Sequence, residues 1–265
     1  MIINGKEIAE GIYTELVVER GHVARPIKLG IVVGTQDAVI ESFVRIKTRA
    51  AARLNVEMVR VDLTVGADTQ VAIDAVKKLS PEVDGVIVQL PLPMNINTDE
   101  VLAAVPNERD VDGINPTIQE QDRSVHAPVA GAVAEIFKRH EIDPQGKRAV
   151  VVGAGRLVGA PVAALLRTRG ADVSIVTLEE GSLDALKSAD IIVLGAGNPG
   201  FIKPEMIKDG VVLIDAGTSE AGGKVMGDAD PACADKASLL TPVPGGVGPI
   251  AVAMIFKNLF ALVQK

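Results

Sequence analysis

The chain has one cysteine, one tyrosine and no tryptophan among its 265 residues. A lone cysteine, Cys233, excludes an internal disulfide and a cluster held by several thiolates, which is typical of a protein from a reducing compartment. Aromatic residues make up 2% of the chain and apolar residues 48%, so we expect an ample core of aliphatic side chains. His126 and His140 are isolated and show no metal-ligand spacing, so we expect no metal.

Charge and hydropathy disfavour two further classes of protein. The formal net charge of −7 leaves no basic surface for nucleic acid or for an anionic membrane. No apolar run approaches the ~20 residues that a membrane-spanning helix needs, and the residues after Met1 lack the pattern of a signal peptide. We therefore predict a cytoplasmic protein that binds neither nucleic acid nor membrane.

What is present is an alternation of short apolar runs with helical patterns. In the first half, the predicted strands and intervening helices lie at 28–34, 37–54, 57–63, 68–79 and 84–91. In the second half, the predicted helices and strands lie at about 130–140, 148–153, 157–169, 171–177, 191–194 and 211–215. Because strands joined by crossover helices form parallel sheets, the sequence predicts an α/β fold of two domains, the second of the Rossmann type.

A proline- and glycine-rich segment at 241–249 precedes an apolar stretch. Three prolines fix φ and three glycines permit conformations that side chains forbid, so we expect a defined loop whose bare backbone can approach a flat ligand. A simple helix-entry loop is the alternative. The apolar stretch predicts a buried helix that starts just after Pro249.

A nucleotide-binding pattern follows the first predicted strand of the second half. Gly153, Gly155 and Gly159 allow a tight turn and close approach to a pyrophosphate, and the helix that they open offers free N–H groups. The spacing is one residue longer than the usual fingerprint. Thr177 and Glu179 end the next strand, where a carboxylate accepts from a ribose hydroxyl and favours NAD over NADP. A solvated acidic turn is the alternative for Glu179.

The candidate chemistry lies in the first half. Phe43 and Lys47 share one helix face, where a lysine is either extending to solvent or functional. Desolvation would lower the pKa of Lys47 and let it carry protons near neutral pH. Gln89 lies at the carboxyl end of a parallel strand, where its amide can orient the lysine or a substrate. Arg45, Arg49 and Arg53 form a separate stripe that we interpret as a solvated face.

Two aspartates, Asp110 and Asp112, lie in a short turn-forming segment. One of them could accept two hydrogen bonds from the donor-rich edge of a ring, and capping of a turn is the alternative role. The pattern does not say which aspartate takes which role.

Four motifs together resemble the bifunctional methylenetetrahydrofolate dehydrogenase/methenyltetrahydrofolate cyclohydrolase family over nearly the whole chain. These motifs lie at 88–93, 110–113, 158–161 and 241–249. The resemblance implies a catalytic, folate-binding domain over 1–121, closed by a C-terminal helix over 248–265, and a Rossmann domain over 122–247 that binds NAD or NADP. It also implies a homodimer and a link to purine biosynthesis.

Residue roles follow from the same resemblance. Lys47 matches the catalytic lysine, Gln89 the residue that tunes it, and Asp112 the aspartate that holds the pterin. The implied substrate-binding residues are Phe43, Asp112, Pro244, Gly245 and Gly246. The implied cofactor-binding residues are Gly153, Ala154, Gly155, Arg156, Val158, Gly159, Thr177, Glu179, Gly195 and Thr218.

The chain departs from the family pattern at several of these positions. Phe43 replaces a tyrosine and loses its hydroxyl, which bears on the cyclohydrolase step. Ala154 and Gly155 replace an arginine and a serine that suit a 2′-phosphate, which agrees with NAD. Three hypotheses follow: a dehydrogenase/cyclohydrolase, a dehydrogenase or specialised pterin-acting paralogue with weak or no cyclohydrolase activity, and a catalytically idle binding protein.

Overall fold

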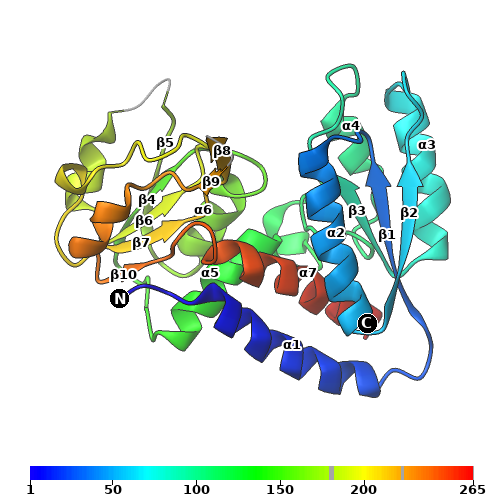
Figure 1. Cartoon of the computed structure of the whole chain (residues 1–265), viewed down its shortest axis with the longest axis horizontal. Helices are drawn as coiled ribbons and strands as arrows, with labels where there is room; N and C mark the ends of the chain where they lie inside the picture. The colour runs from blue at the N-terminus through cyan, green and yellow to red at the C-terminus, as the bar shows by residue number, and fades with distance from the viewer. Residues whose placement is uncertain (179–181, 222–223, 265) are drawn as a thin grey trace. The chain divides into compact units, whose positions relative to one another are not determined.

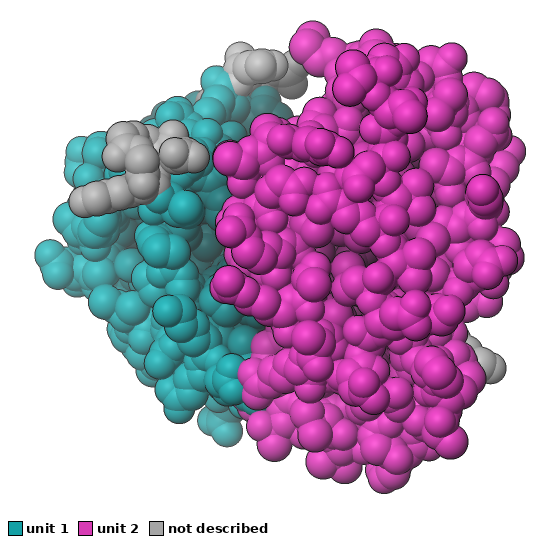
Figure 2. All heavy atoms as spheres, turned by 45° about the vertical axis from the view of Figure 1, so that its right-hand side comes forward, with its two compact units in different colours: residues 1–10, 129–251 teal, residues 11–128, 252–265 magenta. Residues whose placement is uncertain are grey.

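The structure is a computed structural model that describes residues 1–178, 182–221 and 224–264. The chain divides into two compact units, coloured separately in Figure 2. Unit 1 comprises residues 1–10 and 129–251, and unit 2 comprises residues 11–128 and 252–265. Helices α1 (Gly5–Gly21) and α7 (Val247–Val263) contribute residues to both units.

Unit 2 is built on a three-stranded parallel sheet in the order β2–β1–β3 (Figure 1). The strands are β1 (Ile27–Val33), β2 (Val56–Asp62) and β3 (Gly85–Gln89). The connecting helices are α2 (Ala38–Arg53) and α3 (Thr69–Leu79), followed by η1 (Ser80–Glu82), α4 (Thr98–Ala103) and η2 (Glu120–Asp122). One face of the sheet packs on α3 and α4 through an aliphatic core. The crossover from β1 to β2 contains α2, and the crossover from β2 back across β1 to β3 contains α3; because these run in opposite directions, right-handed connections place α2 and α3 on opposite faces of the sheet.

Unit 1 contains a five-stranded parallel sheet in the order β10–β7–β6–β4–β5. Its strands are β4 (Arg148–Val152), β5 (Asp172–Val176), β6 (Ile191–Leu194), β7 (Val212–Asp215) and β10 (Leu239–Leu240). The remaining elements are α5 (Pro128–Arg139), α6 (Gly159–Thr168), η3 (Leu183–Ser188), η4 (Pro204–Met206), β8 (Ser219–Ala221), β9 (Lys224–Met226) and η5 (Pro231–Asp235). Strand β5 pairs with one edge of β4 and β6 pairs with the other edge. The strand order therefore changes direction between β4 and β6.

The predicted two-domain α/β fold is confirmed, and two element predictions need correction. Helix α7 begins at Val247 and not after Pro249, because a proline in the first turn loses no helical hydrogen bond. Helix α1 was not predicted. Its apolar periodicity is weak, since Val17 and Val18 face solvent at 50% and 60% exposure. No helix within the described part of the chain is long and apolar enough to cross a bilayer.

Candidate active site

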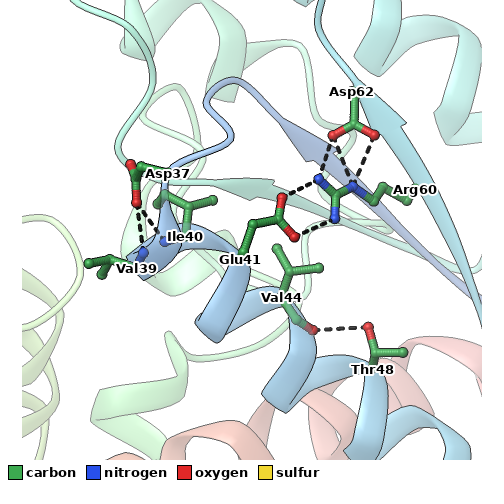
Figure 3. A network of polar contacts seen from close by, with 8 residues as sticks. All are labelled: Asp37, Val39, Ile40, Glu41, Val44, Thr48, Arg60 and Asp62. Carbon is green, nitrogen blue, oxygen red and sulfur yellow. Dashed lines mark hydrogen bonds and ion pairs between the residues drawn. The ribbon is translucent and has the colours of Figure 1, made fainter.

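Helix α2 carries Lys47 and is fixed at its first turn. The Asp37 side chain accepts hydrogen bonds from the N–H groups of Val39 and Ile40, both at 2.9 Å, and so caps the helix (Figure 3). The Arg60 guanidinium of β2 bonds both Glu41 of α2 and Asp62 (Figure 3). Planar, bidentate pairing of this kind holds the helix in one position relative to β2.

The Lys47 ammonium donates a hydrogen bond of 2.6 Å to Gln89 Oε1. Gln89 is the last residue of β3, is 6% exposed, and lies opposite Val33 of β1 in the parallel register. Its Nε2 donates to the Leu90 carbonyl at 2.8 Å, which turns the amide oxygen toward the lysine. The carboxyl end of the sheet therefore presents an oriented amide that accepts from the ammonium.

Burial and charge set the protonation of this group. Burial lowers the pKa of the Lys47 ammonium below its ordinary value, and the Asp112 carboxylate partly offsets the shift. Burial also raises the pKa of Asp112 to about 7, against the opposing effect of Lys47. The Asp112 carboxyl can therefore exchange a proton close to neutral pH, and the neutral form of Lys47 is more populated than in a solvated lysine.

The two aspartates of the 110–113 turn have different roles. Asp110 is 5% exposed, and its Oδ2 accepts from the N–H groups of Ile114 and Asn115 at 2.9 and 2.8 Å. Asp110 is thus the turn-capping residue. Within the described part of the chain, no hydrogen bond is made by the Asp112 carboxylate, whose interactions are electrostatic ones with Lys47 and Asp110. This leaves the Asp112 oxygens available as acceptors.

Asn258 of α7 fixes the same turn and was not found from the sequence. Its Nδ2 donates to the carbonyls of Val111 and His126, each at 2.8 Å. Gly113 has a φ of +58°, and a Cβ there would lie 2.7 Å from the Val125 carbonyl oxygen. The segment that presents Asp112 is therefore tightly determined. A lone asparagine in an apolar helix gave the only sequence signal.

The remaining predicted substrate residues are exposed or have bare backbone. Phe43 lies on α2 with 43% of its surface exposed. In unit 1, Pro244 is exposed, and a Cβ at Gly245, whose φ is +104°, would meet no heavy atom within 4 Å. Gly246 is instead required by close packing, because a Cβ there would lie 2.6 Å from the Pro242 carbonyl oxygen.

The glycines after β4 are required for two different reasons. Gly153 has a φ of +98°, and a Cβ there would lie 2.6 Å from the Gly195 carbonyl oxygen. A Cβ at Gly159 would lie 1.9 Å from the Gly153 carbonyl oxygen. These two glycines serve packing of the loop. A Cβ at Gly155 would meet nothing within 4 Å, so its backbone stays open to a ligand.

This loop leads into α6 in a way that suits a phosphate. Val158 precedes the helix and makes no side-chain hydrogen bond to its first turn. In the first turn, Ala160 N–H already bonds the Gly155 carbonyl at 3.1 Å and Pro161 has no N–H, so the positive dipole end of this ten-residue helix is what it offers to an anion. The geometry fits the pyrophosphate of a dinucleotide.

The other predicted cofactor residues lie on the same edge of the sheet. Thr177 directly follows β5, Gly195 follows β6, and exposed Thr218 follows β7, so all three lie at carboxyl ends of parallel strands. Ala154 and Arg156 are exposed in the loop before α6. Glu179 lies outside the described residues. Among the residues that the structure describes, no group of three or more potential ligands could hold a metal ion.

Comparison with known proteins decides the family. The catalytic-domain model of the tetrahydrofolate dehydrogenase/cyclohydrolase family matches residues 3–112, and its NAD(P)-binding-domain model matches residues 127–265. The chain belongs to the tetrahydrofolate dehydrogenase/cyclohydrolase family. The NAD(P)-binding-domain match covers the five-stranded sheet of unit 1 and extends through α7.

Individual members of the family match almost end to end. The bifunctional protein FolD of Methanoculleus marisnigri is 38% identical over 98% of this chain and 95% of its own length. The solved structure of the bifunctional enzyme from Campylobacter jejuni has a TM-score of 0.94 and 28% identity, covering 100% and 98% of the two chains. The Trypanosoma brucei enzyme, solved with NADP and an inhibitor, has a TM-score of 0.90 and 31% identity, covering 100% and 97%.

Proposed function

We propose that this protein oxidises methylenetetrahydrofolate to methenyltetrahydrofolate with NAD(P) and then hydrolyses the methenyl product to formyltetrahydrofolate. The observation that carries the proposal is the hydrogen bond of 2.6 Å between Lys47 and Gln89, beside the Asp112 carboxylate. Family membership and near full-length relatives named as bifunctional support both activities.

The dehydrogenase step requires positioning more than acid–base chemistry. When bound, NAD(P) would supply the acceptor for a hydride from the methylene carbon. The chain contributes the alignment of donor and acceptor. We assign the folate to residues 1–121 with the C-terminal helix, and the nucleotide to residues 122–247. The Asp112 oxygens would accept from the N–H groups of the pterin, with Phe43 and the backbone of Pro244, Gly245 and Gly246 as further substrate contacts.

The cyclohydrolase step requires movement of protons. Water adds to the methenyl carbon and loses one proton. The bond from that carbon to the ring nitrogen then breaks as the hydroxyl loses its second proton and becomes the formyl oxygen, while the ring nitrogen takes up a proton, so one proton is released in total. Because its pKa is lowered, Lys47 holds more of the neutral amine that can take the first proton, and it can return that proton to the nitrogen. The Gln89 oxygen orients the Lys47 amine throughout.

A preference for NAD over NADP is part of the proposal. Ala154 and Gly155 supply no cationic or hydroxyl side chain to a 2′-phosphate, and Gly155 presents only backbone. The carboxylate of Glu179, which follows β5 in the sequence, would repel that phosphate. The Trypanosoma brucei relative was solved with NADP, so the preference is argued from the residues of this chain alone.

A dehydrogenase with weak or absent cyclohydrolase activity is the second candidate. It is favoured by Phe43, which lacks the hydroxyl of the family's tyrosine and cannot hydrogen-bond Lys47. A silkworm relative with 30% identity is described as a methylenetetrahydrofolate dehydrogenase.

One assay separates these functions. The purified protein is mixed with methylenetetrahydrofolate and either NAD or NADP, while absorbance is followed for the reduced cofactor and for methenyltetrahydrofolate. We expect reduced cofactor to form faster with NAD and methenyltetrahydrofolate to appear only transiently. Persistent methenyltetrahydrofolate would support the second candidate. No reduced cofactor with either nucleotide would contradict both.

A homodimer, a cytoplasmic location and a contribution to purine biosynthesis remain proposals from the family resemblance. Light scattering checks the first, since a dimer has twice the chain mass of 27.6 kDa. A solution mass equal to one chain would contradict it.

A further inference from the structure

Two buried aspartates in unit 1 take no part in the chemistry proposed above. Asp215 ends β7 and is 3% exposed, while Asp228 follows β9 and is 0% exposed. No lysine or arginine within the described part of the chain bonds either carboxylate, and their hydrogen bonds come from backbone N–H groups. Burial of a carboxylate is costly, so a purely space-filling role would be met more cheaply by an apolar side chain.

The Asp228 carboxylate holds the loop that follows β6. Its Oδ2 accepts from the N–H groups of Ala196 at 2.7 Å and Gly197 at 3.1 Å, and its Oδ1 accepts from Asn198 at 2.8 Å. Three successive peptide groups thus point at one side chain. The donors lie 30 to 32 residues away in sequence, so this loop takes its shape from a distant residue.

Asp215 in turn fixes Asp228. Asp215 Oδ1 accepts from the N–H groups of Gly217 at 3.0 Å and Asp228 at 3.2 Å, and Oδ2 accepts from Ala229 at 2.8 Å. The Asp215 backbone is anchored by the buried Thr241 hydroxyl at 2.7 Å. The pair therefore orders the start of the loop after β7 as well as the loop after β6.

The loop after β6 lies against the nucleotide loop. A Cβ at Gly153 would lie 2.6 Å from the Gly195 carbonyl oxygen, and a Cβ at Gly195 would lie 2.5 Å from Val158 Cγ1. Both loops leave the carboxyl ends of β4 and β6, the neighbouring strands between which the strand order changes direction. Open α/β sheets bind their ligands in the crevice at that point.

We propose that Asp228, supported by Asp215, is a positioning residue for the nucleotide: its carboxylate sets the backbone of residues 195–198 so that the wall of the crevice is formed before NAD(P) binds. This inference rests on the proposed function, because the nucleotide is the ligand of that crevice. Both aspartates act through the loops and touch no reacting atom.

Two variants disturb Asp228 in different ways. Asp228→Asn keeps the shape but has a single acceptor oxygen, so at least one of the three N–H groups loses its partner. Gly217→Ala keeps every polar group but places a Cβ 2.3 Å from Asp228 Cγ, which displaces the carboxylate. Asp230→Asn is the matched control, because the Asp230 carboxylate accepts from Ala232 and Lys203 and from none of the N–H groups of residues 195–198.

The probe is NADH or NADPH itself, whose own fluorescence reports its binding. We expect the dissociation constant of the nucleotide, and its KM, to rise on the order of tenfold in both variants relative to the control. The KM for methylenetetrahydrofolate should stay within about twofold. A merely structural role would lower the active fraction, and hence kcat, without changing either nucleotide constant.

Nucleotide affinity within about twofold of the control in the folded variants would overturn the inference. If Asp228→Asn does not fold, Gly217→Ala decides by the same criterion. A wild-type protein that binds neither nucleotide would instead contradict the proposed function itself.

Discussion

Lys47 combines two properties at the residue scale that a surface lysine lacks. Its ammonium has one defined partner at 2.6 Å, and burial lowers its pKa. We expect Lys47→Met to reduce methenyltetrahydrofolate hydrolysis by at least about a hundredfold, the lower range for loss of an acid–base group, while the nucleotide dissociation constant stays unchanged. Stopped-flow absorbance of methenyltetrahydrofolate provides the measurement.

Two further variants show whether the loss comes from proton transfer or from charge. Lys47→Arg keeps the positive charge but cannot release a proton near neutral pH, so it should be as inactive in hydrolysis as Lys47→Met. Arg49→Met, on an exposed position of the same helix, is the matched control and should hydrolyse normally. Full hydrolysis by Lys47→Arg would show that charge, and not proton transfer, is what the site needs.

Asp112 gives the site a pH dependence. Burial raises the pKa of its carboxyl to about 7, and only the ionised form accepts two hydrogen bonds from ring N–H groups. As pH falls through 7 the carboxyl is protonated, so kcat/KM for the folate should fall about tenfold between pH 8 and pH 6. Asp112→Asn should have a lower kcat/KM for the folate, and its pH profile should lack this inflection. An inflection that persists in Asp112→Asn would assign it to another group.

At the scale of elements, the cap of α2 links stability to activity. Asp37→Ala removes the acceptor for two N–H groups of the helix that carries Lys47 and should lower the free energy of unfolding by about 1 kcal/mol. Asp68→Ala removes the equivalent cap of α3 and should cost a similar amount. Urea unfolding measures both, and a severalfold loss of hydrolysis is expected for Asp37→Ala alone. Equal rates of hydrolysis in the two variants would show that the start of α2 does not affect the chemistry.

The same elements show what could be predicted from the sequence. Asp37 and Asp68 precede apolar periodicity, so both helix starts were found within one residue. Helix α1 was missed because Val17 and Val18 break the apolar pattern by facing solvent. The choice between Asp110 and Asp112 stayed open, since it depends on which carboxylate meets the N–H groups of Ile114 and Asn115.

Long-range hydrogen bonds explain why some residues were not predicted from the sequence. Lys47 and Gln89 are 42 residues apart and were still found, because each lies at an expected end or face of its element. Asp228 and its donors are 30 to 32 residues apart and lie in irregular loops, where no periodicity indicates contact. Asn258 bonds carbonyls more than a hundred residues away.

For the whole molecule, Asp215 makes stability depend on pH. Burial raises the pKa of its carboxyl from 3.8 to about 6, so the folded state binds a proton that the unfolded state has released between these values. This contribution is full below pH 3.8 and is lost as pH rises through 6. The loss of this contribution should lower the free energy of unfolding by about 1 kcal/mol between pH 5 and pH 7. In Asp215→Asn the loss of stability between pH 5 and pH 7 should be about 1 kcal/mol smaller than in the wild type, and the remaining loss comes from Asp112, whose pKa is raised to about 7. Urea unfolding at both pH values measures this difference; an unchanged pH slope in that variant would contradict the assignment.

The unequal surroundings of the glycines after β4 bear on redesign of the cofactor preference. Gly153 and Gly159 tolerate no side chain, because their Cβ atoms would overlap backbone oxygens at 2.6 and 1.9 Å. Gly155 has open space, and Ala154 is exposed. Random libraries aimed at a different dinucleotide should therefore diversify Ala154 and Gly155 and keep the two flanking glycines constant.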